Sequence, residues 1–381
     1  DNSASSAYFS RTFTARSELE QLVVSGFVSG DLSQLFELPG GPIRFAIGSE
    51  YRRENAFYQQ DQFITDGYTN GVSIPSHEPN TCEVTEGFAE VLSPVLKEVP
   101  FFHELTVSGA GRVAKYQGNV GTVWSYNVGL DWAPVEDLRF RGNYSRAVRA
   151  PNVSETAFPL VPNFFNNFAD PCNPAQIGQG SANRSANCQA ALGTILPLLT
   201  DTIYSLPIVS GSNPNLKEET SDSWTFGFVL QPRWVRGLSL SVDYYNIVVD
   251  GIITALTPQQ IVNSCYDSPN LNNVFCGQFT RNLTTGSVNG DAAGRIVTNS
   301  LINAPLNFAR RQRKGIDVNL NYRANLGEDI RLTSSLIYTH NLKISNYQDP
   351  INPNFENRIL SELGDPTDEF RFDVDLGLGD V

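Results

Sequence analysis

Residues 122–149 read TVWSYNVGLDWAPVEDLRFRGNYSRAVR, and this stretch decides the fold. Apolar residues at every second position from Trp124 to Trp132 alternate with small or polar ones, and the alternation returns after residues 133–137. Because successive side chains of a strand point to opposite faces, both segments predict strands with one apolar and one polar face. The short segment between them predicts a tight turn, so the whole stretch predicts a β-hairpin.

The length of these strands distinguishes two kinds of protein that could contain them. A soluble sheet with one wet face uses such strands, and so does a membrane barrel with lipid outside and water inside. Each segment runs for about eleven residues, roughly twice the usual soluble strand and close to what a tilted strand needs to cross a bilayer. The length therefore favours a membrane barrel.

The same pattern recurs along the chain. Alternation predicts eleven strands, at 17–31, 43–58, 82–96, 104–116, 122–133, 138–149, 218–231, 238–254, 307–324, 330–345 and 369–379. The segment 295–303 is either a further strand or part of a loop. The sequence therefore predicts an all-β protein.

The connections between these strands are of two kinds. Short turns are expected at 32–42, 97–103, 134–137, 232–237 and 325–329, and long connections at 59–81, 150–217, 255–306 and 346–368. The two kinds mostly alternate, although the link at 117–121 is brief where a long one is due. In an antiparallel meander this places the turns at one end and the loops at the other, as in an outer-membrane barrel.

The composition excludes other classes of protein. The 381 residues carry a net charge of −13, with 40% hydrophobic and 18% charged residues. A negative chain without a basic patch is not expected to bind nucleic acid. No segment approaches the roughly 18 apolar residues of a membrane helix, so a membrane-spanning form would have to be a barrel.

The five cysteines indicate an oxidising compartment. Cys172 and Cys188 lie within one expected long loop, and Cys265 and Cys276 lie within another. Their short spacings predict two loop disulfides, which suits a cell surface. Cys82 is left over, either as a free thiol or with a partner outside these residues.

The sequence offers no catalytic constellation. It contains no evident Ser-His-Asp order, glycine-rich phosphate loop or zinc spacing, so we expect no enzyme, no metal and no cofactor. Residues 289–294 are weakly similar to a calcium loop around Asp291, but the later glutamate of that pattern is missing. We therefore interpret this segment as a turn.

Several segments together resemble the barrels of one receptor family. Residues 142–155, GNYSRAVRAPNVSE, resemble a signature of TonB-dependent receptors. Further segments are similar to the same family, namely the hairpin turn at 132–141, NPNLKEETS at 213–221, the strand at 237–247 and the strand start at 315–317. Each segment alone is a weak signal, but their order along the chain is specific.

The resemblance implies a fold and a function. Members of this family are 22-stranded, transmembrane, antiparallel up-and-down β-barrels closed by an N-terminal plug domain. They bind a scarce nutrient, such as a siderophore, vitamin, saccharide or peptide, and import it with energy delivered by TonB with ExbB–ExbD. We therefore expect residues 1–381 to be part of such a barrel, with the plug and the last strands outside this sequence.

The family also implies a location and a set of contacts. The protein is expected in the bacterial outer membrane as a multi-pass barrel, in contact with lipid and lipopolysaccharide. Two alternatives remain at this point. One is a passive porin or structural outer-membrane barrel, and the other is a secreted β-sandwich adhesin.

Aromatic residues inside the long loops are the candidates for ligand binding. Loops are normally polar, so an apolar cluster within one is a potential binding surface. The candidates are Phe164, Phe165, Phe168 and Tyr204 in the first cysteine loop and, more weakly, Tyr266 and Phe275 in the second. The alternative is that these side chains pack the loop against itself or against a neighbouring loop.

Overall fold

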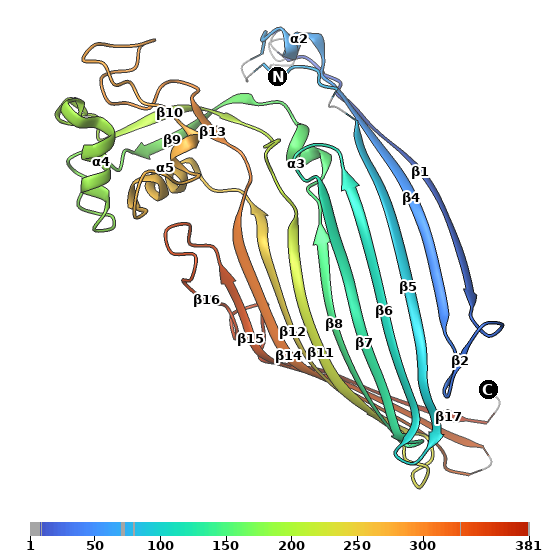
Figure 1. Cartoon of the computed structure of the whole chain (residues 1–381). Coiled ribbons are helices and arrows are strands. Elements are labelled where there is room, and N and C mark those ends of the chain that lie inside the picture. Colours follow the sequence, from blue (N-terminus) through green and yellow to red (C-terminus); the bar gives the residue numbers. More distant parts are fainter. Residues whose placement is uncertain (1–7, 9, 70–72, 79–80, 328, 380–381) are drawn as a thin grey trace.

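The main feature of the molecule is one long antiparallel sheet (Figure 1). The computed structural model describes residues 8, 10–69, 73–78, 81–327 and 329–379. The long strands are β1 (Arg16–Asp31), β4 (Arg44–Gln59), β5 (Cys82–Val99), β6 (Phe102–Tyr116), β7 (Thr122–Val135), β8 (Leu138–Arg149), β11 (Glu219–Leu230), β12 (Leu238–Thr254), β14 (Leu306–Asn325), β15 (Ile330–Tyr347) and β17 (Asp368–Leu378). All the strands predicted from alternation are confirmed.

These strands follow one another across the sheet in chain order. Each pairs antiparallel with the long strand before it, and β17 pairs with β15. The edge strands are β1 and β17, and within the described residues they are not hydrogen-bonded to each other. Figure 1 shows that the sheet curves, so the fold is an open section of an up-and-down barrel wall.

One face of the sheet is apolar and exposed. On β7 the side chains of Trp124, Val128 and Leu130 are 62%, 56% and 50% exposed. The rings of Tyr144 on β8 and Trp224 on β11 pack across the strands, with centroids 4.4 Å apart. Soluble proteins rarely expose an apolar surface of this extent, whereas the outer face of a barrel meets lipid with one.

The opposite face is polar, and its charges are paired between strands. Arg141 on β8 donates from Nε to Asp243 on β12 at 2.7 Å. Arg139 on β8 donates to Glu104 on β6 at 2.6 Å and also to Asp131 on β7. Each pair joins residues on one face, as strict alternation requires.

A glycine on β14 makes room for an aromatic ring on this polar face. A Cβ at Gly315 would collide with the ring of Tyr245 on β12. The Tyr245 hydroxyl donates to the side-chain oxygen of Asn341 on β15 at 3.0 Å. The glycine of the segment 315–317 therefore has a packing reason.

The long connections all lie at one end of the sheet, as predicted (Figure 1). They contain the helices α2 (Gln62–Thr65), α3 (Val153–Ala157), α4 (Arg184–Leu192) and α5 (Pro258–Asp267). Within the described residues, no helix is both long enough and apolar enough to cross a membrane. The other end carries short turns and the hairpin of β2 (Glu37–Leu38) with β3 (Gly41–Pro42). The small strand β16 (Asn357–Arg358) pairs with β15.

Two details of the connections differ from the sequence analysis. The turn expected at 97–103 shrinks to two residues, because β5 continues to Val99 and Phe101 adopts a φ of +64°. The segment 295–303, for which the sequence allows either a strand or a loop, contains the short strand β13 (Leu301–Asn303). It lies beside the loops and not in the wall.

The two faces of β7 make a direct test of orientation. Replacing Val128 by Arg places a charge on the apolar face near the middle of the strand. We expect it to lower the free energy of unfolding in lipid by about 2–4 kcal/mol. The matched change Asn127→Arg, on the polar face, should cost much less. Urea titrations of the full-length protein refolded in vesicles measure both, and equal losses would contradict this assignment of the faces.

Candidate functional site

Two long loops combine into one small folded domain above the sheet. The first loop carries β9 (Val161–Ala169), α4, a 3₁₀ turn η1 (Gly193–Leu198) and β10 (Ile203–Ser210). The second carries α5, a 3₁₀ turn η2 (Cys276–Gln278) and β13. Strand β10 lies between β9 and β13 in a three-stranded sheet, so the two loops share secondary structure. We call residues 161–210 and 255–303 the two-loop domain.

The two-loop domain has its own hydrophobic core. Its fully or almost fully buried members include Phe168, Leu192, Ile195, Leu199, Leu206, Ile208, Ile261, Val262, Tyr266, Phe275, Ile296 and Leu301. They come from both loops in similar numbers. Neither loop could bury these side chains without the other, so the two must fold together.

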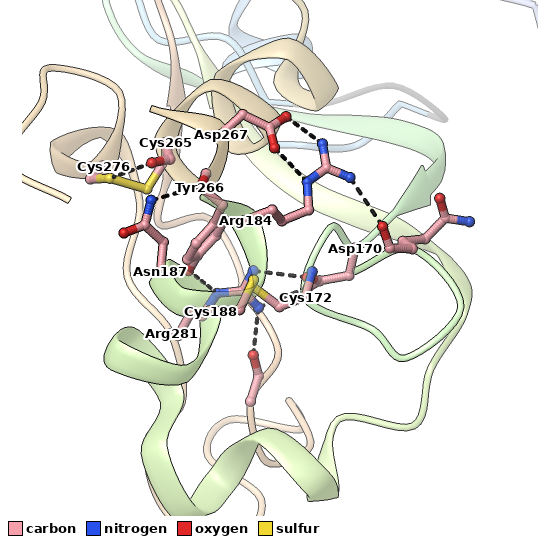
Figure 2. Close-up of a disulfide and its surroundings, with 12 residues drawn as sticks. Asp170, Cys172, Arg184, Asn187, Cys188, Cys265, Tyr266, Asp267, Cys276 and Arg281 are labelled. Carbon is pink, nitrogen blue, oxygen red and sulfur yellow. Dashed lines mark hydrogen bonds and ion pairs between the residues drawn. A yellow bond between two sulfur atoms is a disulfide. The ribbon is translucent and has the colours of Figure 1, made fainter. Parts of the chain in front are cut away.

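Two buried ion pairs join one loop to the other. Arg184 on α4 donates from Nε to Asp267 at the end of α5 at 2.7 Å, and Figure 2 shows the two side chains facing each other. Arg281 donates to both carboxylate oxygens of Asp170, at 2.8 and 2.9 Å. All four side chains are at most 6% exposed. Such pairs are costly to break, because the remaining partner is left charged in a dry interior.

The disulfides, by contrast, lie within single loops. Cys172 is bonded to Cys188 in the first loop, and Cys265 to Cys276 in the second (Figure 2). Both predicted pairings are confirmed. Cys82 is a free cysteine at the start of β5.

Local sequence signals explain where α5 begins. Thr257 caps the helix by accepting from the Gln260 backbone, and the Gln260 side chain accepts from the Thr257 backbone in return. Pro258 occupies the first helical position, where no N–H is needed. The helix thereby presents Asp267 to Arg184 at its far end.

A charged cluster ties the first loop to the wall. Arg149 at the end of β8 contacts Glu155 on α3 at 3.0 Å and Glu219 at the start of β11 at 2.6 Å. Glu219 also accepts from the backbone N–H of Ile253 on β12, at 2.8 Å. We call Arg149, Glu155 and Glu219 the stem, because it holds three strand ends and a loop helix together.

Asparagine side chains extend the stem to the second loop. Asn213 donates from its side chain to the Pro305 carbonyl at 2.9 Å. Asn307 donates to the carbonyls of Lys217 and Gly251, at 3.0 and 2.8 Å. The residues of segments 142–155 and 213–221 therefore meet at the base of the two-loop domain.

Most of the aromatic candidates for ligand binding lie inside the two-loop domain. Phe168, Tyr266 and Phe275 are buried in its core, and Phe165 and Tyr204 pack against that core. The Tyr266 hydroxyl accepts from Arg281 at 2.7 Å. These five aromatic side chains therefore pack the two loops against each other, which is the alternative to ligand binding that the sequence left open.

Phe164 is the exception among the predicted ligand residues. It lies on β9, and its side chain is 58% exposed. On the neighbouring strand, Pro207 is its register partner. Phe164 is therefore the candidate whose ring a ligand could reach without rearrangement of the domain.

The ion pairs were missed by sequence reasoning. The partners Arg184 and Asp267 are 83 residues apart, and Asp170 and Arg281 are 111 apart. No local pattern marks such pairs. Asp291, interpreted from the sequence as a turn residue, accepts from the backbone and the hydroxyl of Thr298, so a structural role accounts for its carboxylate.

A family model described as TonB dependent receptor-like, beta-barrel, matches residues 1–376. No curated protein matches the chain significantly. The siderophore receptor PirA of Acinetobacter baumannii is similar in structure, with 16% identity and a TM-score of 0.52, over 86% of this chain and 37% of that one. A mutant of the ferric enterobactin receptor PfeA of Pseudomonas aeruginosa, in complex with enterobactin, gives 14% identity and a TM-score of 0.51, over 94% and 46%.

These likenesses concern the fold, because both identities are low. The chain spans less than half of the length of each of the two structures. The family model, in contrast, covers nearly the whole chain.

Breaking one inter-loop ion pair should destabilise the two-loop domain. Arg184→Ala leaves Asp267 buried and unpaired, and we expect a loss of about 3–5 kcal/mol in the free energy of unfolding of the domain. Limited proteolysis under increasing urea measures it. The exposed Arg233, which follows β11 and contacts Glu136 and Asp137 in the turn before β8, supplies the control, because Arg233→Ala should cost about 1 kcal/mol or less. Equal effects of the two variants would contradict a structural role for the buried pair.

The two-loop domain should also be sensitive to alkali. Burial raises the pKa of both Tyr204 and Tyr266. Their contribution to stability is complete below the unfolded pKa of about 10 and is lost as the pH rises through the folded-state values. We expect the urea midpoint of the domain to fall between about pH 10 and 12. The double variant Tyr204→Phe/Tyr266→Phe should flatten this dependence, and an unchanged dependence would contradict the assignment.

Proposed function

Because the chain belongs to the TonB-dependent receptor family, we propose that it forms wall and surface loops of an outer-membrane receptor that takes up a scarce nutrient. The observation that best supports this proposal is the two-loop domain, a folded unit that the stem fixes at the long-loop end of the wall. A domain held together by a shared core and by ion pairs between its loops presents a rigid surface. A rigid surface loses little conformational entropy when it binds a ligand. Phe164 and the polar loop groups around it would contribute to that surface.

The other readings of the sequence fit these features less well. A secreted β-sandwich buries the apolar faces of its sheets, whereas Trp124, Val128 and Leu130 are exposed here. A passive pore has no evident need for a domain with its own core and two ion pairs above the wall. We therefore favour the receptor, with lipid and lipopolysaccharide against the apolar face.

The proposal includes partners beyond the 381 residues. A plug domain and further strands would complete the barrel, and TonB with ExbB–ExbD would supply energy through the plug. The nutrient belongs to the classes that such receptors import, namely siderophores, vitamins, saccharides and peptides. PirA and PfeA are named as receptors for siderophores or ferric enterobactin, and this supports a siderophore as the first nutrient to test. We propose no catalytic role.

Uptake with and without TonB tests this function. Cells that express the full receptor should accumulate labelled nutrient faster than cells without it, and loss of TonB should abolish the difference. The matched variant replaces residues 161–210 and 255–303 together by short Gly-Ser linkers, because removing one loop would expose the core of the other.

The linker variant should still insert into the outer membrane but fail to bind the nutrient. Migration of heated and unheated samples on gels reports the folded wall. Uptake that continues without TonB would contradict an energised receptor and favour a pore. Unchanged binding by the linker variant would contradict a role for the two-loop domain.

A further inference from the structure

A second feature of the long-loop end is a segment that crosses the ends of neighbouring strands. Residues 151–160, which include α3, form what we call the strap. Its Ala157 carbonyl accepts a hydrogen bond from Nε2 of His77 in the loop after β4. The Phe158 ring packs edge-on against Tyr58 at the end of β4, with centroids 6.5 Å apart. The strap thus starts at the end of β8 and is attached beside β4, which lies four strands away in the sheet.

A cavity of about 440 Å³ lies between the strap and the strand ends. Its walls include His77, Glu78, Thr81, Cys82, Tyr116 and Leu216. Cavities of 300–1,000 Å³ that combine apolar walls with a few polar groups are typical of small-molecule sites. The long-loop end therefore contains a candidate subsite apart from the two-loop domain.

The charges around this cavity favour a cation. Among the described residues, no side chain forms a hydrogen bond or ion pair with the carboxylate of Glu78. The nearby guanidinium groups are already paired, since Arg52 and Arg112 both face Glu86, which is only 5% exposed. Arg52 also lies 3.8 Å from Glu54. Among the described residues that line the cavity there is no Lys or Arg, so an anion would meet no guanidinium or ammonium group on its wall, whereas a cation would meet Glu78.

A smaller apolar cavity continues the site. It has a volume of about 210 Å³, and Leu19, Tyr58, Val153 and Phe158 line it. His77 and Ala157 line both cavities, so the two lie on either side of the attachment point of the strap. A ligand with one charged and one apolar part would match the pair.

We propose that the space beneath the strap is a binding subsite for a small organic cation, an amine or quaternary ammonium that carries an apolar group. The proposal rests on the receptor function given above, because it places part of the nutrient there. Glu78 supplies the opposite charge, and Tyr116 adds an aromatic ring to the same cavity wall. The apolar group enters the smaller cavity beside Phe158.

Cys82 provides a reporter that requires no knowledge of the nutrient. It is half-buried on the cavity wall and is the free cysteine of the described residues. Two thiol reagents of similar size and opposite charge can be compared, the trimethylammonium-ethyl and sulfonatoethyl methanethiosulfonates. The same Cys82 thiolate attacks the thiol-derived sulfur of each reagent and releases methanesulfinate, so the acidity of Cys82 cancels in the ratio of the two rates.

In the full receptor we expect the cationic reagent to react with Cys82 about five- to tenfold faster than the anionic one, after each rate is divided by its rate with a free thiol. Glu78→Gln should reduce that preference to about twofold or less, and high salt should weaken it. The control Glu37→Gln, in the hairpin at the short-turn end, should leave it unchanged.

Equal normalised rates for the two reagents would overturn the proposal, and so would a preference that survives Glu78→Gln. The measurement needs neither TonB nor nutrient, so it can fail while uptake succeeds, or succeed while uptake fails. A cation preference without uptake would support the subsite and contradict the receptor function.

Discussion

A continuous antiparallel ladder with strict side-chain alternation is the constraint on which the rest of the structure depends. Shifting one strand by a single residue would exchange its apolar and polar faces. The pairs of Arg139 with Glu104 and of Arg141 with Asp243 oppose such a shift, because each joins two strands on the polar face. The packing of Tyr245 over Gly315 adds a steric condition on the same face.

The same constraint positions the candidate site. Because the meander alternates short turns with long connections, both cysteine loops leave the wall at one end and can share a core. The stem then fixes their base, since Arg149 holds a helix of the first loop and the start of β11 together. The two-loop domain is therefore placed by the wall and stabilised by its own interior.

The wall could be predicted from sequence because its signals are local. Alternation over ten or more residues, as in residues 122–149, is visible without any knowledge of partners. The disulfides were also predictable, since each joins cysteines within one loop. The small strands β9 and β10 were missed because tertiary packing determines them, and Phe168 shows the result, an apolar loop residue that is core and not surface. The Arg184–Asp267 pair has no local signal at all.

The disulfides and the ion pairs of the two-loop domain join different parts of it, and this has a consequence for assembly. Covalent bonds lie within each loop, and the links between the loops are ion pairs and apolar contacts. Each loop can therefore be oxidised independently, before its partner has been threaded into place. The two oxidised loops can also separate and associate again without disulfide exchange. Opening of the domain therefore depends on the hydration of its apolar core and of its ion pairs, and not on the redox potential.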